Sequence, residues 1–237
     1  MSPLPDDRDE SIAVTKPRPG HADLAGILKY HHSDIRNILE RASARDTVSR
    51  TAVGSFCKQL LEPFGIKVMG YIRSLGGVVA QTEGLTYEEI FESSEQSPVR
   101  VADKEAEEKM IALIDECKKR GDTLGGVFEV VAIGLPPGLG SHTQWDRKLD
   151  GRLARALMSV QTVKAVEMGS GIQAAHGPGS EAHDEIHWSR EKGFYRKTSM
   201  AGGIEGGMSN GEDITMRAYL KPIATLKSPL MSVDIKT

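Results

Sequence analysis

The chain contains four strand-like runs, and the number of helical patterns between successive runs differs. This feature restricts the possible folds more than any other in the sequence. The runs cover residues 66–72, 127–133, 163–168 and 214–220. Two helical patterns follow the first run and one follows the second, but none follows the third. A doubly wound parallel sheet needs a crossover helix for each pair of neighbouring strands. The sequence therefore predicts a layered α+β fold.

Local end signals define the helices before and between these strands. Thr86 and Glu89 have the spacing of a capping box. Asp103 begins a longer helix that Gly121 ends, and Asp34 caps a short helical turn. The predicted helices cover residues 22–30, 44–61, 86–93, 103–120 and 146–160.

The helix predicted at 44–61 carries apolar side chains at helical spacing, namely Val48, Ala52, Phe56 and Leu60. Cys57 belongs to the same helix, and Cys117 lies in the apolar pattern of the helix that begins at Asp103. These two cysteines are the only ones in the sequence, and they form no CxxC motif. We interpret both as buried free thiols in a reducing compartment.

Residues 169–211 differ from the rest of the chain, because they hold ten of its 25 glycines and three of its seven histidines with little periodicity. A segment of this length without regular structure is usually functional or mobile. Residues 169–211 are therefore expected to form a functional or mobile loop. Residues 1–20, with four prolines, are expected to be extended, and residues 231–237 are strand-like.

The charge of the chain excludes a general attraction to polyanions. Its 30 basic and 33 acidic residues give a net charge of -3, so nucleic acid and acidic membrane surfaces are not expected partners. No apolar run is long enough to cross a bilayer, and the first residues have no signal-peptide pattern. We therefore expect a cytoplasmic protein.

The segment 17–47 combines a titratable side chain with two arginines. His21 follows a Pro-Arg-Pro-Gly turn, and two interpretations of it are open: a positioned acid or base, or a surface helix cap. Arg41, Ser43 and Arg45 have the donors that phosphate needs. The alternative for these three is solvated charge that pairs with neighbouring acids.

Three further features are candidate sites. The glycine-rich stretch 200–211 allows close backbone approach to a ligand, but it matches neither a dinucleotide fingerprint nor a P-loop. Lys221 ends a strand, where it would either contact phosphate or lie at an ordinary strand edge. His183 and His187 are four residues apart, as in a zinc hydrolase, although Asp184 occupies the position where metalloproteases have glutamate.

Several long segments, in order, closely resemble chorismate synthase. They are RPGHADLAGILKY, RNILERASARDT, SVQTVKAVEMGSGIQAAHGPGSEAHDEI, MAGGIEGGMSNGEDI and MRAYLKPIATL. Residues 40–56 also match the central signature of that family at every fixed position. The resemblance implies a β-α-β sandwich, usually tetrameric, and a lyase of the shikimate pathway, which leads to the aromatic amino acids. The implied reaction is the trans-1,4 elimination of phosphate from 5-enolpyruvylshikimate 3-phosphate, and it depends on reduced FMN.

The resemblance also implies roles for individual residues. His21 would protonate or hydrogen-bond the reduced flavin, and Arg18 would contact an anionic group of the substrate. A long closing loop is expected to exclude water, and residues 169–211 would serve as that loop. The FMN contacts would be Arg41, Ala42, Ser43, Gln161, Thr162, Gly206, Lys221, Pro222, Ile223, Ala224 and Thr225. Alanine is more usual in the family at the position of Thr162.

Two signatures of the family are absent from the sequence: Gly-x-Ser-His-Gly, with a second catalytic histidine, and Arg-Ser-Asp. The resemblance therefore implies that residues 1–237 are the central portion of a single domain of this family, in which residues 169–211 form a Gly/His-rich active-site loop. The alternative to an active synthase is an inactive fragment that binds FMN or anions. The resemblance leaves open whether NADPH reduces the flavin on the enzyme or an external reductase does.

Overall fold

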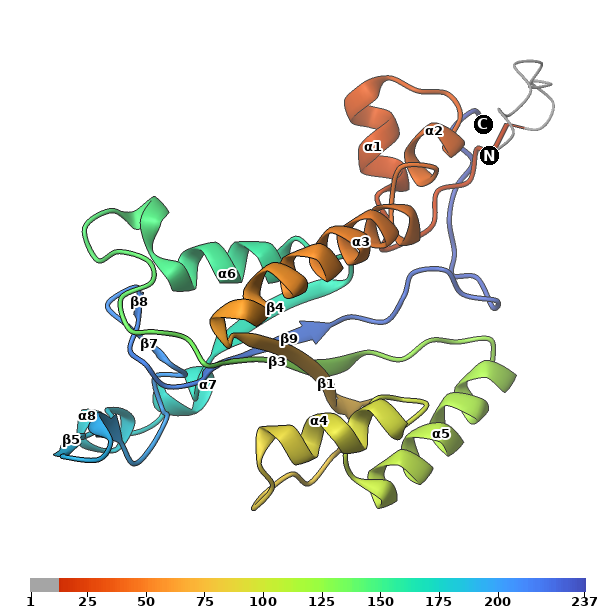
Figure 1. Cartoon of the computed structure of the whole chain (residues 1–237). Helices are drawn as coiled ribbons and strands as arrows, with labels where there is room; N and C mark the ends of the chain where they lie inside the picture. The colour runs from red at the N-terminus through yellow and green to blue at the C-terminus, as the bar shows by residue number, and fades with distance from the viewer. Residues whose placement is uncertain (1–12) are drawn as a thin grey trace.

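A five-stranded antiparallel sheet forms the centre of the computed structural model, which describes residues 13–237 (Figure 1). The strand order is β2-β1-β3-β9-β4. The strands are β1 (Lys67–Leu75), β2 (Val78–Val79), β3 (Gly126–Ile133), β4 (Val163–Met168) and β9 (Ile214–Leu220). Every pairing is antiparallel, and helices lie on both faces (Figure 1). The predicted α+β class and the four strand runs are confirmed.

The alternation of side chains along β9 separates the two faces of the sheet. Ile214 and Met216 point to one face, where they pack with apolar residues of α6 (Leu149–Met158), a helix that follows the short 3-10 turn η3 (Trp145–Arg147). Arg217 points to the other face and forms an ion pair with Glu129 of β3, at 2.6 Å between Nε and Oε2. The same sheet therefore has an apolar core on one side and a charged cluster on the other.

Two helices cover the β1–β2 side of that second face. They are α4 (Tyr87–Gln96) and α5 (Lys104–Lys119). The predicted capping box of Thr86 and Glu89 is present, and Gly121 ends α5 with a φ of 72° that suits glycine. Met110 of α5 is completely buried in the core that it forms with Val101.

In the described part of the chain, three α-helices precede the sheet. They are α1 (Asp23–Tyr30), α2 (Arg36–Leu39) and α3 (Ala44–Leu61), which continues into the 3-10 turn η2 (Glu62–Phe64). Helix α3 lies beside α6 on the same side of the sheet, and α1 and α2 lie beyond one end of α3 (Figure 1). The N-cap of α2 is Ile35 rather than the predicted Asp34, but Asp34 accepts a hydrogen bond from the Arg36 amide at 3.0 Å. Among residues 13–237, no helix is long and apolar enough to cross a membrane.

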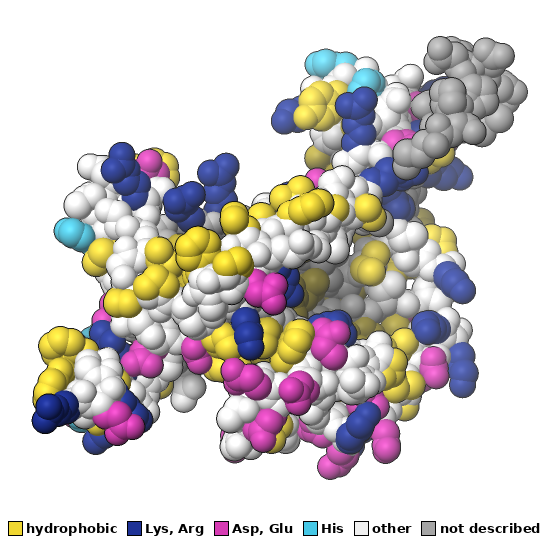
Figure 2. Space-filling model, viewed as in Figure 1, with side chains coloured by type: hydrophobic (Ala, Val, Ile, Leu, Met, Phe, Trp, Pro, Cys, Tyr) yellow, Lys and Arg dark blue, Asp and Glu magenta, His cyan; other side chains and the backbone are white. Residues whose placement is uncertain are grey.

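The burial expected of Cys57 is wrong, because this residue is exposed, whereas Cys117 is buried as predicted. The apolar stripe of α3 is exposed as well: Val48, Phe56 and Leu60 keep 69%, 73% and 69% of their accessible surface. Figure 2 shows hydrophobic side chains along this helix. Helical spacing places side chains on one face, but a second layer must cover that face, and residues 13–237 do not supply one.

Residues 169–211 contain short elements, which local periodicity did not reveal. These are α7 (Gly171–Ala174), α8 (Gly179–Ala182), the hairpin β5 (Ile186–Ser189) and β6 (Gly193–Arg196), and the hairpin β7 (Ile204–Glu205) and β8 (Met208–Ser209). Each element is four residues or fewer, too short for a repeating pattern. The segment leaves the end of β4 and returns at the start of β9 (Figure 1).

The strand predicted at 231–237 is wrong, because these residues form no regular element. They run beside residues 14–17, where the Ile235 amide donates to the Thr15 carbonyl at 3.0 Å and the Ser232 hydroxyl donates to the Pro17 carbonyl. Residues 13–18 are irregular, as expected. The same expectation for residues 1–12 falls outside the described residues.

Candidate functional site

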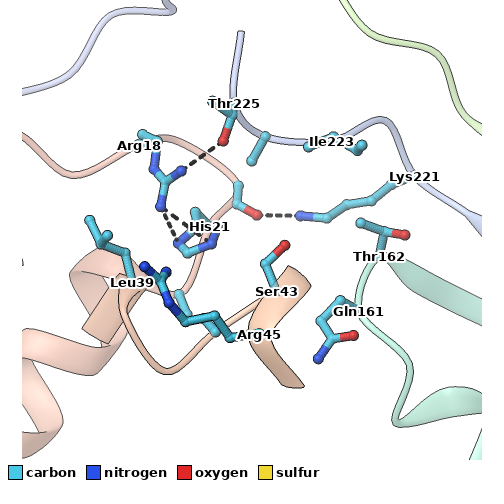
Figure 3. A pocket seen from close by; sticks show the side chains of 14 residues that line it. Arg18, His21, Leu39, Ser43, Arg45, Gln161, Thr162, Lys221, Ile223 and Thr225 are labelled. Atoms are coloured by element: carbon cyan, nitrogen blue, oxygen red, sulfur yellow. Dashed lines mark hydrogen bonds between the residues drawn. The ribbon is translucent and has the colours of Figure 1, made fainter. Parts of the chain in front are cut away.

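A cavity of about 360 Å³ lies where four segments of the chain meet (Figure 3). The segments are the turn before α1, the junction of α2 and α3, the residues before β4, and the residues after β9. The lining residues are Arg18, Gly20, His21, Ala22, Leu39, Ala42, Ser43, Arg45, Gln161, Thr162, Lys221, Ile223, Ala224 and Thr225.

The pairing of β4 with β9 brings two of these segments together. Val163 at the start of β4 lies opposite Leu220 at the end of β9. The next residues outward, Thr162 and Lys221, therefore emerge side by side, and the Lys221 amide donates to the Thr162 carbonyl at 2.9 Å. Sheet register thus fixes one wall of the cavity.

The turn before α1 is tied to the chain that follows β9. Gly20 has a φ of 77°, a conformation that glycine adopts without strain, and its carbonyl accepts a hydrogen bond from the Lys221 ammonium. Arg18 donates to the Thr225 hydroxyl at 2.7 Å. These contacts place Arg18, His21 and Lys221 around one space (Figure 3).

Asp23 binds the two polar side chains of this turn, Arg18 and His21. No role was assigned to Asp23 from the sequence. Its carboxylate is 1% exposed and accepts from His21 Nδ1 at 2.5 Å and from Arg18 Nε at 2.9 Å. Burial raises the pKa of Asp23, but the hydrogen bonds from Arg18 and His21 outweigh that effect and lower the pKa overall. The available sequence signal was an aspartate two residues after the histidine, in the first turn of a helix.

The N-terminus of α3 faces the cavity, because Ser43 and Arg45 both line it. Ser43 is the residue before the helix, and its side chain makes no capping hydrogen bond. The first-turn amides therefore have no side-chain acceptor at this position, an arrangement that favours a bound anion. Arg45 adds a guanidinium, paired only loosely with Glu40 at 3.4 Å.

Backbone strain is concentrated at this cavity. Of the four non-glycine residues with positive φ among residues 13–237, Ser43 (φ 60°) and Thr162 (φ 72°) line it. Such conformations cost about 1–3 kcal/mol each and recur at ligand sites. The surrounding hydrogen bonds hold both residues in a shape that an unconstrained chain would avoid.

Gln161 is oriented by α3. Its amide nitrogen donates to Asp46 at 2.7 Å, and its amide oxygen accepts from the Thr47 hydroxyl at 2.9 Å. The hydrogen bond from Gln161, with a second one from Arg50, lowers the pKa of the Asp46 carboxyl. The segment before β4 is thereby attached to the first turn of α3.

Most residues proposed from the sequence line this cavity, and three do not. Arg41 lines a neighbouring groove of about 660 Å³ together with Lys29 and Tyr30. Pro222 lies between two lining residues without contributing to the wall. Gly206 lies on the exposed β7–β8 turn near the other end of β9. No residue of 169–211 lines the cavity.

The histidine pair considered for zinc is not on one helix. His183 follows the last residue of α8, and His187 lies on β5, where its ring stacks on Tyr195. Among residues 13–237 no group of three or more histidine, cysteine or acidic side chains is arranged to hold a metal ion.

Comparison with known proteins gives one consistent result. The family model of chorismate synthase matches residues 6–237. Chorismate synthases from Pelobacter propionicus and Symbiobacterium thermophilum are 58% and 57% identical over the whole chain. A solved chorismate synthase structure, 47% identical, superposes with a TM-score of 0.81 over 85% of this chain and 63% of its own. The chain spans 62% of the length of the two bacterial relatives.

Proposed function

This chain belongs to the chorismate synthase family, and from that membership we propose that its cavity forms part of a chorismate synthase active site. The reaction is the trans-1,4 elimination of phosphate from 5-enolpyruvylshikimate 3-phosphate, a carbon-oxygen lyase reaction. The observation that carries the proposal is the meeting of Arg18, His21 and Lys221 around one cavity. A phosphorylated, multiply charged substrate needs such cationic donors.

The donor set of the cavity suits FMN as well. Lys221 and the Thr225 hydroxyl offer a point charge and a hydrogen bond for a phosphate group, beside the N-terminus of α3. Gln161 and Thr162 offer polar contacts, and Ala42 and Ile223 offer apolar surface for a flat ring. Bound reduced FMN would lend electron density to the substrate and take it back, with no net redox change.

The residues of this chain would bind and orient the ligands of the cavity, and one of them would hold a proton. Arg18 pairs with an anionic group of the substrate, and Arg45 adds charge at the opposite wall. His21 lines the cavity, and because its Nδ1 contacts Asp23, Nε2 is the ring nitrogen left for a ligand, with an Arg18 terminal nitrogen 3.4 Å away. In that position the imidazole donates a proton or a hydrogen bond to the ligand nearest to it.

The proposal extends to Arg41, Ser43, Ala224, Pro222 and Gly206 as FMN contacts. Ser43 and Ala224 line the cavity. Arg41, Pro222 and Gly206 do not line it, so they would contact FMN only if the ligand reached beyond the cavity or if these segments moved toward it. It also includes the homotetramer and the cytoplasmic location expected of the family. NADPH is the proposed reductant wherever the flavin is reduced on the enzyme.

A chimera tests this function. In it, residues 1–237 replace the matching part of the Pelobacter propionicus relative, and phosphate release from 5-enolpyruvylshikimate 3-phosphate is measured anaerobically with reduced FMN. We expect release in the chimera and a loss of at least about 100-fold in its His21→Ala variant. The control is His142→Ala, at an exposed histidine outside the cavity. Equal activity in the His21 variant and the control would contradict the proposal.

A further inference from the structure

The Asp23 carboxylate makes four contacts to two residues that line the cavity. Oδ1 lies 2.5 Å from His21 Nδ1 and 3.2 Å from an Arg18 terminal nitrogen. Oδ2 lies 2.9 Å from Arg18 Nε and 3.0 Å from the Arg18 backbone nitrogen. With 1% of its side chain exposed, Asp23 has no access to a ligand itself, so any contribution to the site passes through Arg18 and His21.

The contact at Oδ1 determines which ring nitrogen of His21 carries the proton. An ionised carboxylate only accepts hydrogen bonds, so the donor at 2.5 Å is Nδ1–H. In the neutral ring Nε2 is then the unprotonated nitrogen and can accept, with an Arg18 terminal nitrogen as a donor 3.4 Å away, and in the protonated ring Nε2 becomes a donor. Burial raises the pKa of the Asp23 carboxyl, but the hydrogen bonds from Arg18 and His21 lower this pKa overall and favour the ionised form.

Contacts at both carboxylate oxygens fix the guanidinium of Arg18, with Nε at Oδ2 and a terminal nitrogen at Oδ1. Two nitrogens of the fork bind one carboxylate, a geometry that holds the plane of the guanidinium. The remaining terminal nitrogen of Arg18 donates to the Thr225 hydroxyl at 2.7 Å. The plane is therefore fixed between a buried carboxylate and the segment that follows β9.

We propose that Asp23 is a positioning residue that holds His21 as the Nδ1–H tautomer, with Nε2 toward the cavity, and fixes the Arg18 fork at the cavity wall. This role rests on the proposed function, because His21 Nε2 acts on a ligand only if the cavity binds one. One carboxylate would then set both the proton donor and an anion contact of the same site.

The charged groups around the His21 ring come from three segments. Arg18 and Asp23 belong to the turn and to the first residue of α1. Lys221, which follows β9, binds the carbonyl of Gly20 next to the ring. Arg45 contributes from α3 at the cavity wall. Asp23 is the acid among these groups, and its Oδ1 lies 2.5 Å from Nδ1, while an Arg18 terminal nitrogen lies 3.1 Å from the same ring atom.

Nitrogen NMR of the histidine ring tests the role without any ligand. The chain is labelled with 15N-histidine, and the His21 signals are identified by their loss in His21→Gln. At a pH where the ring is neutral, we expect the native chain to show a protonated Nδ1 and a bare Nε2. A protonated Nε2 in the native chain overturns the proposal, and this reading needs no variant to fold.

Asp23→Asn supplies the second reading. Its amide oxygen remains opposite the two Arg18 donors at Oδ2, so its NH2 group faces His21 Nδ1 and reverses the tautomer. An unchanged tautomer in a folded variant overturns the proposal. The matched control is Asp34→Asn, since Asp34 also binds an arginine two residues away, Arg36, but touches no histidine. This control keeps the native His21 tautomer.

Reduced FMN, added anaerobically, separates the role of Asp23 from the proposed function. We expect it to shift the Nε2 signal of the native chain and to bind Asp23→Asn at least about tenfold more weakly, because Arg18 and His21 lose their common partner. Equal affinity for Asp23→Asn and the native chain overturns the positioning role. An Nε2 signal that reduced FMN does not shift in the native chain overturns the proposed function. The NMR of the ring without ligand still decides whether Asp23 fixes the tautomer of His21.

Discussion

The side-chain amide of Gln161 donates to the carboxylate of Asp46 at 2.7 Å and so connects the residue before Thr162 to the first turn of α3. Arg50 binds the same carboxylate oxygen at 2.7 Å. The cavity therefore lies beside a connection between sheet and helix that is made by side chains.

Gln161→Leu removes this donor, and we expect the pKa of the Asp46 carboxyl to rise toward its ordinary value. The hydrogen bond from Gln161 is the main cause of the lowered pKa, and the bond from Arg50 remains. A carbon NMR titration of the Asp46 carboxyl measures the change. Gln59→Leu, at an exposed glutamine of α3, is the control. If the pKa of Asp46 is the same in both variants, Gln161 does not bind this carboxylate in solution.

Arg217 lies between two buried carboxylates of the sheet. Its Nε is 2.6 Å from Glu129, and a terminal nitrogen is 3.6 Å from Glu167. Arg217→Met leaves both carboxylates without a cation, so we expect the free energy of unfolding to fall by about 3 kcal/mol. Urea unfolding at pH 7 measures it.

The control for Arg217 is Arg190→Met, at an exposed arginine. A second comparison adds Glu129→Gln to Arg217→Met and should recover part of the loss, because one uncompensated charge is removed. Equal losses in the single and double variants would mean that Arg217 contributes by packing of its side chain rather than by charge.

Asp34 gives the stability of the chain a dependence on pH. Its hydrogen bond with the Arg36 side chain, aided by backbone amides, lowers the pKa of this carboxyl from 3.8 to about 2. A lowered pKa stabilises the folded state above the unfolded value and loses that effect as pH falls toward the folded value. We expect Asp34→Asn to cost about 1 kcal/mol at pH 7, and the difference from the native chain to shrink between pH 4 and 2.

Urea unfolding at a series of pH values measures this difference. The matched control is Asp115→Asn, at a largely exposed aspartate whose Oδ1 lies 3.9 Å from the Lys118 ammonium. A cost of Asp34→Asn that stays constant down to pH 2 would assign the effect to lost packing rather than to the ionised carboxylate.

Local patterns predicted the elements of this fold whose ends are fixed within a few residues. The valine-rich run 163–168 became β4 with the same bounds, and Thr86 and Glu89 formed their capping box because both partners lie in one turn. Burial was harder to predict. The stripe of Phe56 on α3 is regular, but its exposure depends on which other layer is present.

The parts of the candidate site whose residues are adjacent in the sequence were predictable. The parts that the register of the sheet brings together were not. Thr162 and Lys221 meet because Val163 pairs with Leu220, and no local pattern contains that register. Asp23 was missed for a related reason. A buried carboxylate acquires a role only through its two partners, Arg18 and His21, and their side chains meet only once the turn is folded.

Lys221 offers the sharpest test of how the cavity treats phosphate. FMN and riboflavin share the same ring and differ in one phosphate group, so the ratio of their affinities isolates the contacts to that group. The Lys221 ammonium lines the cavity beside the N-terminus of α3, and a hydrogen bond to a charged group contributes about 1.5–3 kcal/mol. We expect Lys221→Met to weaken FMN binding at least about tenfold and to change riboflavin binding little. The control is Lys164→Met, at an exposed lysine of β4 that does not line the cavity. Equal weakening of both flavins by Lys221→Met would show that Lys221 supports the Gly20 turn rather than the phosphate.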